Sequence, residues 1–254
     1  MASTLACLGM HVDDLDRLGD VLDQLPADLV GRVATDEGVV ESVRHRDDSG
    51  ACVVLARLDG GVVDLVPTFE SDRGARLGGL GVAGEAVVAD VLDDDGETVT
   101  RLACDLVQRR HVRDAGPVDA AVVALGVEVG VHADAAAFAA SDDSVLGEPE
   151  PGEEPMRLTA QSFVSYGLFS GDADPEPTAF LAGEVLAAES RTHAVTGQSF
   201  HVLQVETVGF TATVCLAASE HPTLPAPGSV VAGVCYLVAD APDLWSFEPQ
   251  PGSP

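Results

Sequence analysis

Short apolar runs separated by tight polar turns occupy much of the first part of the chain. Three such runs have the length and Val-rich composition of β-strands, at 38–46, 51–58 and 62–69. The turns between them, 47–50 and 59–61, consist of aspartate, serine and glycine, the residues that tight hairpins favour. The pattern therefore predicts a three-stranded antiparallel meander.

Ahead of this meander, the apolar pattern changes its period. The continuous run 5–12 predicts a strand, while the apolar residues from Leu15 to Leu25 recur at intervals of three and four, as on one face of a helix. Asp13 is placed to cap this helix and Pro26 to end it. We therefore expect a strand followed by a helix over 13–25.

Apolar runs elsewhere predict further strands. The runs 85–92 and 98–107 flank an Asp-rich turn, 118–131 predicts another strand, and 133–140 predicts a short helix. Alternation of apolar and polar residues, clearest at 210–217, predicts β-structure in the last part of the chain. Five strands are expected there, at 162–169, 180–189, 200–208, 210–217 and 229–238.

An acidic segment interrupts the series of strands. Residues 141–155 read SDDSVLGEPEPGEEP, with six carboxylates, three prolines and two glycines, a composition typical of a solvated linker. The sequence thus predicts an α+β, β-rich protein with an acidic N-terminal domain of strand, helix and meander at 1–140. After the linker at 141–155, a small OB-like or SH3-like β-barrel is expected at 156–246, followed by a tail at 247–254.

Composition limits the classes of function. The 254 residues include 42 acidic and 13 basic ones, all the basic ones being arginine, and neither lysine, isoleucine nor asparagine occurs. The missing residues have AT-rich codons, which indicates a GC-rich genome, but the net charge of −29 needs a physical reason. Such a surface opposes binding to nucleic acid and to anionic membranes. Selection for solubility, or adaptation to a salt-rich host, would also favour an acidic surface.

Targeting signals and reactive cysteines are not apparent in the sequence. The N-terminus lacks a basic region, and no segment approaches the roughly 20 uncharged apolar residues of a membrane span, so we expect a cytosolic protein. The five cysteines, widely spaced and without a C-x-x-C pair, predict buried thiols.

Known catalytic motifs are weak or missing. Residues 79–84 match G-x-G-x-x-G, but the preceding strand and following helix that a dinucleotide site requires are not predicted. The sequence contains no G-x-S-x-G and no H-x-x-x-H. We therefore predict no cofactor and assign no catalytic residue from the sequence.

One cluster of polar residues is a candidate binding site. Arg191, His193 and His201 lie near the predicted turn at 194–198, and His221 follows the next strand. Two imidazoles and a guanidinium could hold an anion, and three histidines could hold a metal ion. An ordinary solvated hairpin tip is the alternative.

The order of strand, helix and three-stranded meander over 5–69 is similar to one βαβββ module of the glyoxalase-like vicinal-oxygen-chelate proteins. The resemblance implies a metal ligand on the first strand, where His11 lies. A paired module should repeat the pattern, yet no helix comparable to 13–25 follows Phe69. A generic α+β sandwich explains the same order of elements.

From these patterns we expect a non-catalytic binding or assembly module whose partner is a protein. One alternative is a metal-dependent or anion-binding enzyme that uses the histidines above. Another is an acidic decoy that occupies the nucleic-acid site of a basic protein.

Overall fold

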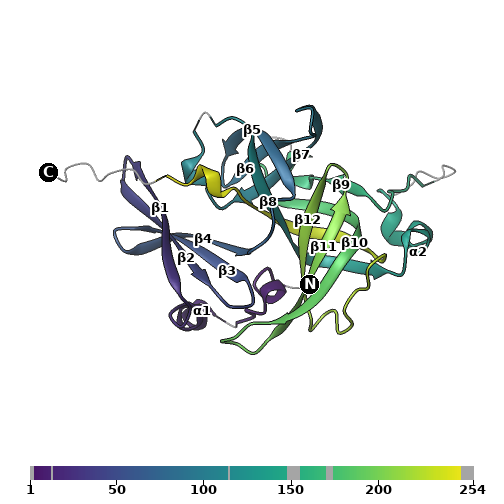
Figure 1. The fold of residues 1–254 in the computed structure, drawn as a ribbon, viewed down its shortest axis with the longest axis horizontal. Helices are drawn as coiled ribbons and strands as arrows, with labels where there is room; N and C mark the ends of the chain where they lie inside the picture. The colour runs from purple at the N-terminus through teal and green to yellow at the C-terminus, as the bar shows by residue number, and fades with distance from the viewer. Residues whose placement is uncertain (1–2, 13, 114, 148–154, 170–173, 247–254) are drawn as a thin grey trace.

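Strands dominate the computed structural model, which describes residues 3–12, 14–113, 115–147, 155–169 and 174–246 (Figure 1). They form one sheet of four strands and one of nine, so the β-rich α+β expectation is confirmed. The helices within the described residues are short: η1 Ala6–Leu8, α1 Leu15–Leu22, η2 Arg109–His111, α2 Ala135–Ala140, η3 Asp142–Ser144, η4 Tyr166–Phe169 and η5 Pro242–Leu244.

The smaller sheet is an antiparallel meander in the order β1-β2-β3-β4. Its strands are β1 Ala27–Thr35, β2 Gly38–Arg46, β3 Ala51–Leu58 and β4 Gly61–Phe69. The last three confirm the predicted meander. The sequence analysis missed β1, whose register with β2 shifts between Leu29 and Gly31, so its apolar residues do not alternate regularly.

The N-terminal segment differs from the prediction. Residues 5–12, expected as a strand, contain the 3₁₀ turn η1, and Cys7, Leu8 and Met10 are fully buried beneath the smaller sheet. Gly9 ends this turn with a φ of 68°, which extended backbone cannot have. The βαβββ module of the glyoxalase-like resemblance therefore lacks its first strand.

Helix α1 is shorter than the predicted helix over 13–25. Its N-cap is Asp14, whose carboxylate accepts a hydrogen bond from the Arg17 backbone N–H at 2.8 Å. Asp13, the cap expected from the sequence, lies outside the described residues. The apolar residues Leu18 and Leu22 pack into the core beneath the smaller sheet.

The larger sheet contains every strand predicted after residue 84 and one more, β5, which holds the first glycines of the G-x-G-x-x-G match. The predicted strand at 162–169 is only three residues long and is followed by η4. The nine strands are β5 Ala75–Ala83, β6 Ala86–Leu92, β7 Thr98–Leu106, β8 Val118–His132, β9 Ser162–Val164, β10 Thr178–Thr192, β11 Ser199–Thr207, β12 Phe210–Ala217 and β13 Val230–Asp240.

Two closed rings of hydrogen-bonded strands share the central antiparallel pair β8–β13. One ring is completed by β5, β6 and β7, and the other by β10, β11 and β12. In each ring the three-stranded meander joins the central pair through one antiparallel and one parallel contact. The unit β5–β8 is thus repeated topologically by β10–β13, and each unit lends its last strand to the other ring.

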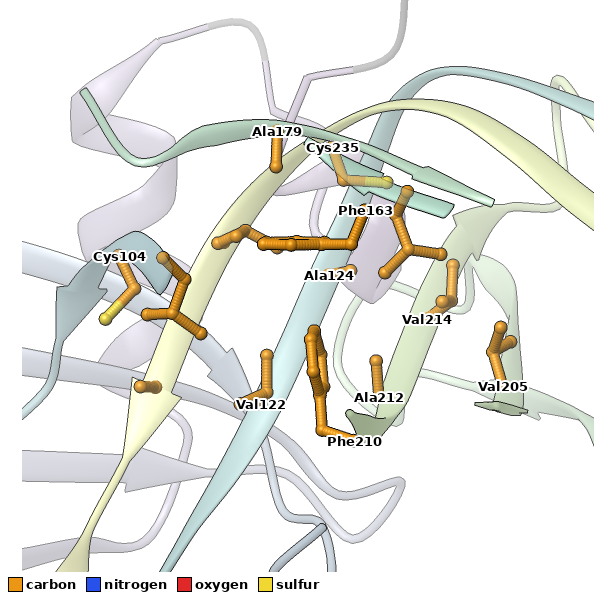
Figure 2. Packing of buried hydrophobic residues seen from close by; sticks show 14 of the residues in the cluster. Cys104, Val122, Ala124, Phe163, Ala179, Val205, Phe210, Ala212, Val214 and Cys235 are labelled. Carbon is orange, nitrogen blue, oxygen red and sulfur yellow. The ribbon is translucent and has the colours of Figure 1, made fainter. Parts of the chain in front are cut away.

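Apolar side chains fill the interior of both rings as one continuous core. Figure 2 shows part of it, with the Phe163 and Phe210 rings edge to face at 5.2 Å between centroids and Val122 and Ala124 of β8 beside them. Leu77 and Leu102 extend the same core into the ring of β5–β8. A second core lies between the smaller sheet and the outer face of β8, β11 and β12.

The central pair β8–β13 crosses the predicted domain boundary. The predicted domains 1–140 and 156–246 place β8 in one and β13 in the other, whereas these two strands pair along most of their length. The ring of β8, β10, β11, β12 and β13 therefore includes a strand from before residue 141, and β9 pairs at the edge of β10. Residues 70–74 connect β4 of the smaller sheet to β5 of the larger one. Residues 148–154 and 247–254 of the predicted linker and tail lie outside the described residues.

Candidate functional site

The four residues of the predicted anion or metal site lie in two separate pairs. Arg191 and His193 face the smaller sheet at the tip of the β10–β11 hairpin, where the second core begins. His201 and His221 lie together at the end of the second ring. The two pairs have different partners.

At the hairpin tip, His193 is fully buried, and its Nδ1 lies 3.8 Å from the carboxylate of Asp47 in the β2–β3 turn. Asp47 accepts hydrogen bonds from the backbone N–H groups of Ser49 and Ala194, at 2.8 and 3.0 Å. Burial opposes the charged carboxylate, but these hydrogen bonds and His193 hold the pKa of Asp47 below its ordinary value. Burial lowers the pKa of His193, and the nearby Asp47 carboxylate offsets only part of this decrease.

Arg191 completes this junction rather than an open anion site. Its guanidinium donates to the Ser49 carbonyl at 2.9 Å and to Glu189 at 2.6 Å, and it lies 5.8 Å above the Phe69 ring. The charge expected to bind an external anion is thus engaged by groups of the protein itself. The contacts join the hairpin tip to the β2–β3 turn.

His201 connects β11 to the chain that follows β12. Its Nε2 lies 2.7 Å from the carbonyl oxygen of His221, and its Nδ1 lies 2.7 Å from the hydroxyl of Ser190 on β10. A carbonyl only accepts hydrogen bonds, so Nε2 donates to His221, while Nδ1 shares the second hydrogen bond with Ser190. Both ring nitrogens are therefore used in fixing the start of the β12–β13 connection.

His11, the alternative ligand on the resemblance to the glyoxalase-like proteins, is exposed at the N-terminal segment. Its backbone N–H and carbonyl both bond the Gln198 side chain at 2.9 Å, which ties this segment to the β10–β11 hairpin. Across the described residues, no three His, Cys, Asp or Glu side chains are grouped in an arrangement that could hold a metal ion.

A groove lies beside the His201–His221 pair. It consists of two depressions of about 570 Å³ each that share Glu220 and His221. The first lies over β8, β13 and β10, with Phe180, Ala232 and Val234 in its lining. The second separates the end of β8 from the β12–β13 connection, where its lining runs from 220 to 226. Figure 1 shows this connection passing beside the end of β8.

The groove carries exposed carboxylates at its rim, and buried apolar side chains line its first depression. Glu128, Asp143 and Glu220 contribute carboxylates, and none of the described lining residues is an arginine. His132 lies 3.0 Å from the Asp143 carboxylate, and burial lowers the pKa of His221. The apolar contribution comes from Phe180, Ala232 and Val234 in the first depression and from Val131, Pro222, Leu224 and Pro225 in the second.

Strand β8 presents an open edge to this groove. It pairs with β12 only through Val123–Leu125, while it pairs with β13 as far as His132. Val127 is an extra residue between the pairs Gly126–Cys235 and Glu128–Val234, and this bulge marks where β8 leaves β12. On the side away from β13, residues 128–132 pair with no described strand.

A polar network joins the two sheets at the other end of the β8–β13 pair, where Asp240 lies opposite Ala121. Asp240 accepts from Arg44 of β2 and from the fully buried Gln108, both at 2.6 Å. Asp64 of β4 accepts from Arg109 and Arg110 at 2.6 Å. The sequence analysis did not single out these residues, although three arginines within 109–113 of so acidic a chain are a local signal.

Next to this network, Asp105 is buried and accepts a hydrogen bond from the Tyr236 hydroxyl at 2.9 Å. Burial raises the pKa of Asp105 to about 6, against the lowering effects of Tyr236 and Arg109. Burial and the neighbouring Asp105 raise the pKa of Tyr236. These groups are enclosed between the sheets and do not line the groove.

Comparisons with protein-family models, curated proteins and solved structures found no match to this chain. None of the helices within the described residues is both long and apolar enough to cross a membrane. Because no matched protein supplies a site, the groove is assigned as the candidate site from the structure alone.

Proposed function

We propose that the chain is a non-catalytic, cytosolic protein-binding module and that the groove beside β8 is its binding site. The observation that carries the proposal is the groove itself, in which apolar side chains and an acidic rim border a strand edge without a described partner strand. Protein interfaces commonly combine an apolar centre with a polar rim.

The contacts of the polar side chains favour binding over catalysis. The candidate ligands contact other parts of the chain instead: His193 lies against Asp47, Arg191 donates to the Ser49 carbonyl, and His201 bonds Ser190. A catalytic site instead requires such groups to converge on a space that a substrate can enter. The metal-dependent or anion-binding enzyme is the weaker proposal for this reason.

A protein partner fits the charge better than a nucleic acid, because phosphate-binding surfaces need cations that this rim does not supply. The acidic-decoy alternative requires carboxylates along one ridge. Exposed carboxylates occur instead at 14–23 in and around α1, at 36–37 and 93–97 in hairpin turns of the two sheets, and at 142–143 in η3. The groove gives the binding-module proposal a definite location.

As part of the same proposal, we interpret the ring of β8 and β10–β13 as a small barrel of OB or SH3 type. A ring of five strands, closed by β8, offers a rigid scaffold whose loops and edges can recognise ligands. The groove lies at one edge of this ring.

Site-specific photocrosslinking tests the proposal. A benzophenone amino acid replaces Val131 in the groove or, as a control, Val62 on β4; both valines are exposed, at 41% and 56%. Irradiation in a lysate of the native host, followed by mass spectrometry, should give one reproducible partner from position 131 that excess unlabelled protein displaces.

The proposal is contradicted if position 131 yields no displaceable partner, or if position 62 yields the same proteins. A second pair of variants, Val131→Asp and Val62→Asp, checks the result without a crosslinker. Only Val131→Asp should lose the partner, and both should unfold at similar urea concentrations because both sites are exposed.

A further inference from the structure

We infer that the groove binds an extended segment that alternates basic and apolar residues and adds as a strand to the open edge of β8. The inference rests on the proposed function, since it specifies the partner of the same groove. The backbone of 128–132, the bordering prolines and the charge of the rim each support it.

The edge of β8 supplies hydrogen-bonding groups of the right kind. In an antiparallel pair, alternate residues direct their N–H and C=O groups away from the partner strand. Because β13 occupies one side of residues 128–132, the outward groups along this stretch face the groove. Five residues span roughly 17 Å at the rise of a β-strand, enough for a segment of about five or six residues.

The opposite wall of the groove cannot complete this sheet in the place of a ligand. The β12–β13 connection borders the edge with Pro222 and Pro225, which have no backbone N–H to donate to a neighbouring strand. His201 holds the start of the connection through the His221 carbonyl. The wall therefore limits the width of the groove but leaves the β8 edge unpaired.

Side-chain preferences follow from the two faces of the strand. Glu128 and His132 are four residues apart and therefore lie on one face of β8. The carboxylate of Asp143 lies against His132 on that face. Val131 faces the other way and lines the second depression together with Leu224. An added strand would therefore place cationic side chains beside the carboxylates and apolar ones beside Val131, in alternation.

Fluorescence anisotropy with synthetic peptides provides the test. The probe is a labelled peptide of three arginine–valine repeats; one control replaces arginine by glutamate, and a second carries N-methyl groups on alternate residues, on either register. We expect binding of the arginine–valine peptide only, with an affinity at least tenfold above both controls, and slower hydrogen exchange of amides within 128–132 when it is bound.

Two protein variants locate the site. Glu128→Arg should weaken binding of the arginine–valine peptide at least tenfold, whereas Glu184→Arg, an exposed glutamate on β10 outside the groove lining, should leave it within twofold. Equal binding of the glutamate peptide, unchanged binding after N-methylation in both registers, or equal effects of the two variants would overturn strand addition.

The outcomes also separate this inference from the proposed function. If crosslinking at position 131 identifies a displaceable partner but the peptides do not bind, the groove binds proteins by another geometry and strand addition is wrong. If neither crosslinking nor peptide binding occurs, the proposed function fails as well.

Discussion

Asp47 and Asp105 are both buried carboxylates, yet their surroundings shift their pKa values in opposite directions. Asp47 accepts two backbone hydrogen bonds and faces His193, which together outweigh the cost of burying its charge. Asp105 has one hydrogen bond, from Tyr236, and its Oδ1 has no hydrogen-bond partner among the described residues. Stronger desolvation, fewer hydrogen-bond donors and the neighbouring carboxylates of Asp64 and Glu85 together give Asp105 the opposite sign of shift.

Replacement of Asp47 should destabilise the fold substantially. In Asp47→Ala the buried N–H of Ser49 and the partly buried N–H of Ala194 lose their acceptor, so we expect the free energy of unfolding to fall by about 2 to 4 kcal/mol. Asp48→Ala, at the exposed neighbouring position, should change it by less than about 0.5 kcal/mol. Urea unfolding of the three proteins measures both values, and equal losses would show that Asp47 does not hold the junction.

Asp105 should make stability depend on pH. Its folded pKa, about 6, lies above the unfolded value of 3.8, so its contribution to stability is complete below pH 4 and declines as the pH rises through 6. Asp105→Asn removes this decline while keeping an acceptor for Tyr236. The stability of the variant relative to the natural protein should therefore increase by on the order of 2 kcal/mol between pH 4 and pH 7.

Urea unfolding at several pH values measures this difference, with Asp72→Asn at an exposed position as the control. A difference between Asp105→Asn and the natural protein that stays constant from pH 4 to pH 7 would contradict the raised pKa. The control should show no comparable trend.

At the scale of elements, two glycines should respond oppositely to alanine. Gly9 has a φ of 68°, and an added Cβ would lie 2.7 Å from the carbonyl oxygen of Gln198, so Gly9→Ala should cost about 2 to 4 kcal/mol. Gly19 lies within α1 with open space around it, and Gly19→Ala should stabilise by about 0.5 to 1 kcal/mol. Urea midpoints compare the two, and stabilisation by both would contradict the close packing of η1.

Elements with local signals could be predicted from the sequence. The meander β2–β4 and the pair β6–β7 have turn residues at both ends and apolar runs of strand length. Strand β5 lacked such a signal because Gly78, Gly79 and Gly81 remove the side chains that would show alternation. The run 5–12 looked like a strand because complete burial, here of a 3₁₀ turn, also gives a continuous apolar run.

The candidate site was predictable only in part. His201 and His221 were singled out and do lie beside the groove, but Glu128 and Asp143 were hidden among 42 acidic residues. Their place beside Ala232, Val234 and Glu220 depends on the pairing of β8 with β13, which joins residues about a hundred positions apart and leaves no local trace.

At the scale of the whole molecule, the shared strand pair predicts which fragments can fold. A fragment of residues 156–246, the predicted second domain, lacks β8 and cannot close its ring, so we expect no cooperative unfolding transition. A fragment of residues 116–246 contains all five strands of that ring and should regain a transition. Urea titration followed by circular dichroism measures both, and cooperative unfolding of 156–246 would support an independent second domain.

The sharing of β8 and β13 also has a consequence for biosynthesis. β8 leaves the ribosome more than a hundred residues before β13, which at typical elongation rates is a delay of roughly 5 to 20 s. During this interval neither ring can close, and the apolar strands β5–β8 have exposed edges. The last strand then completes both rings at once, so the chain should fold only after most of it is synthesised and should depend on chaperones until then.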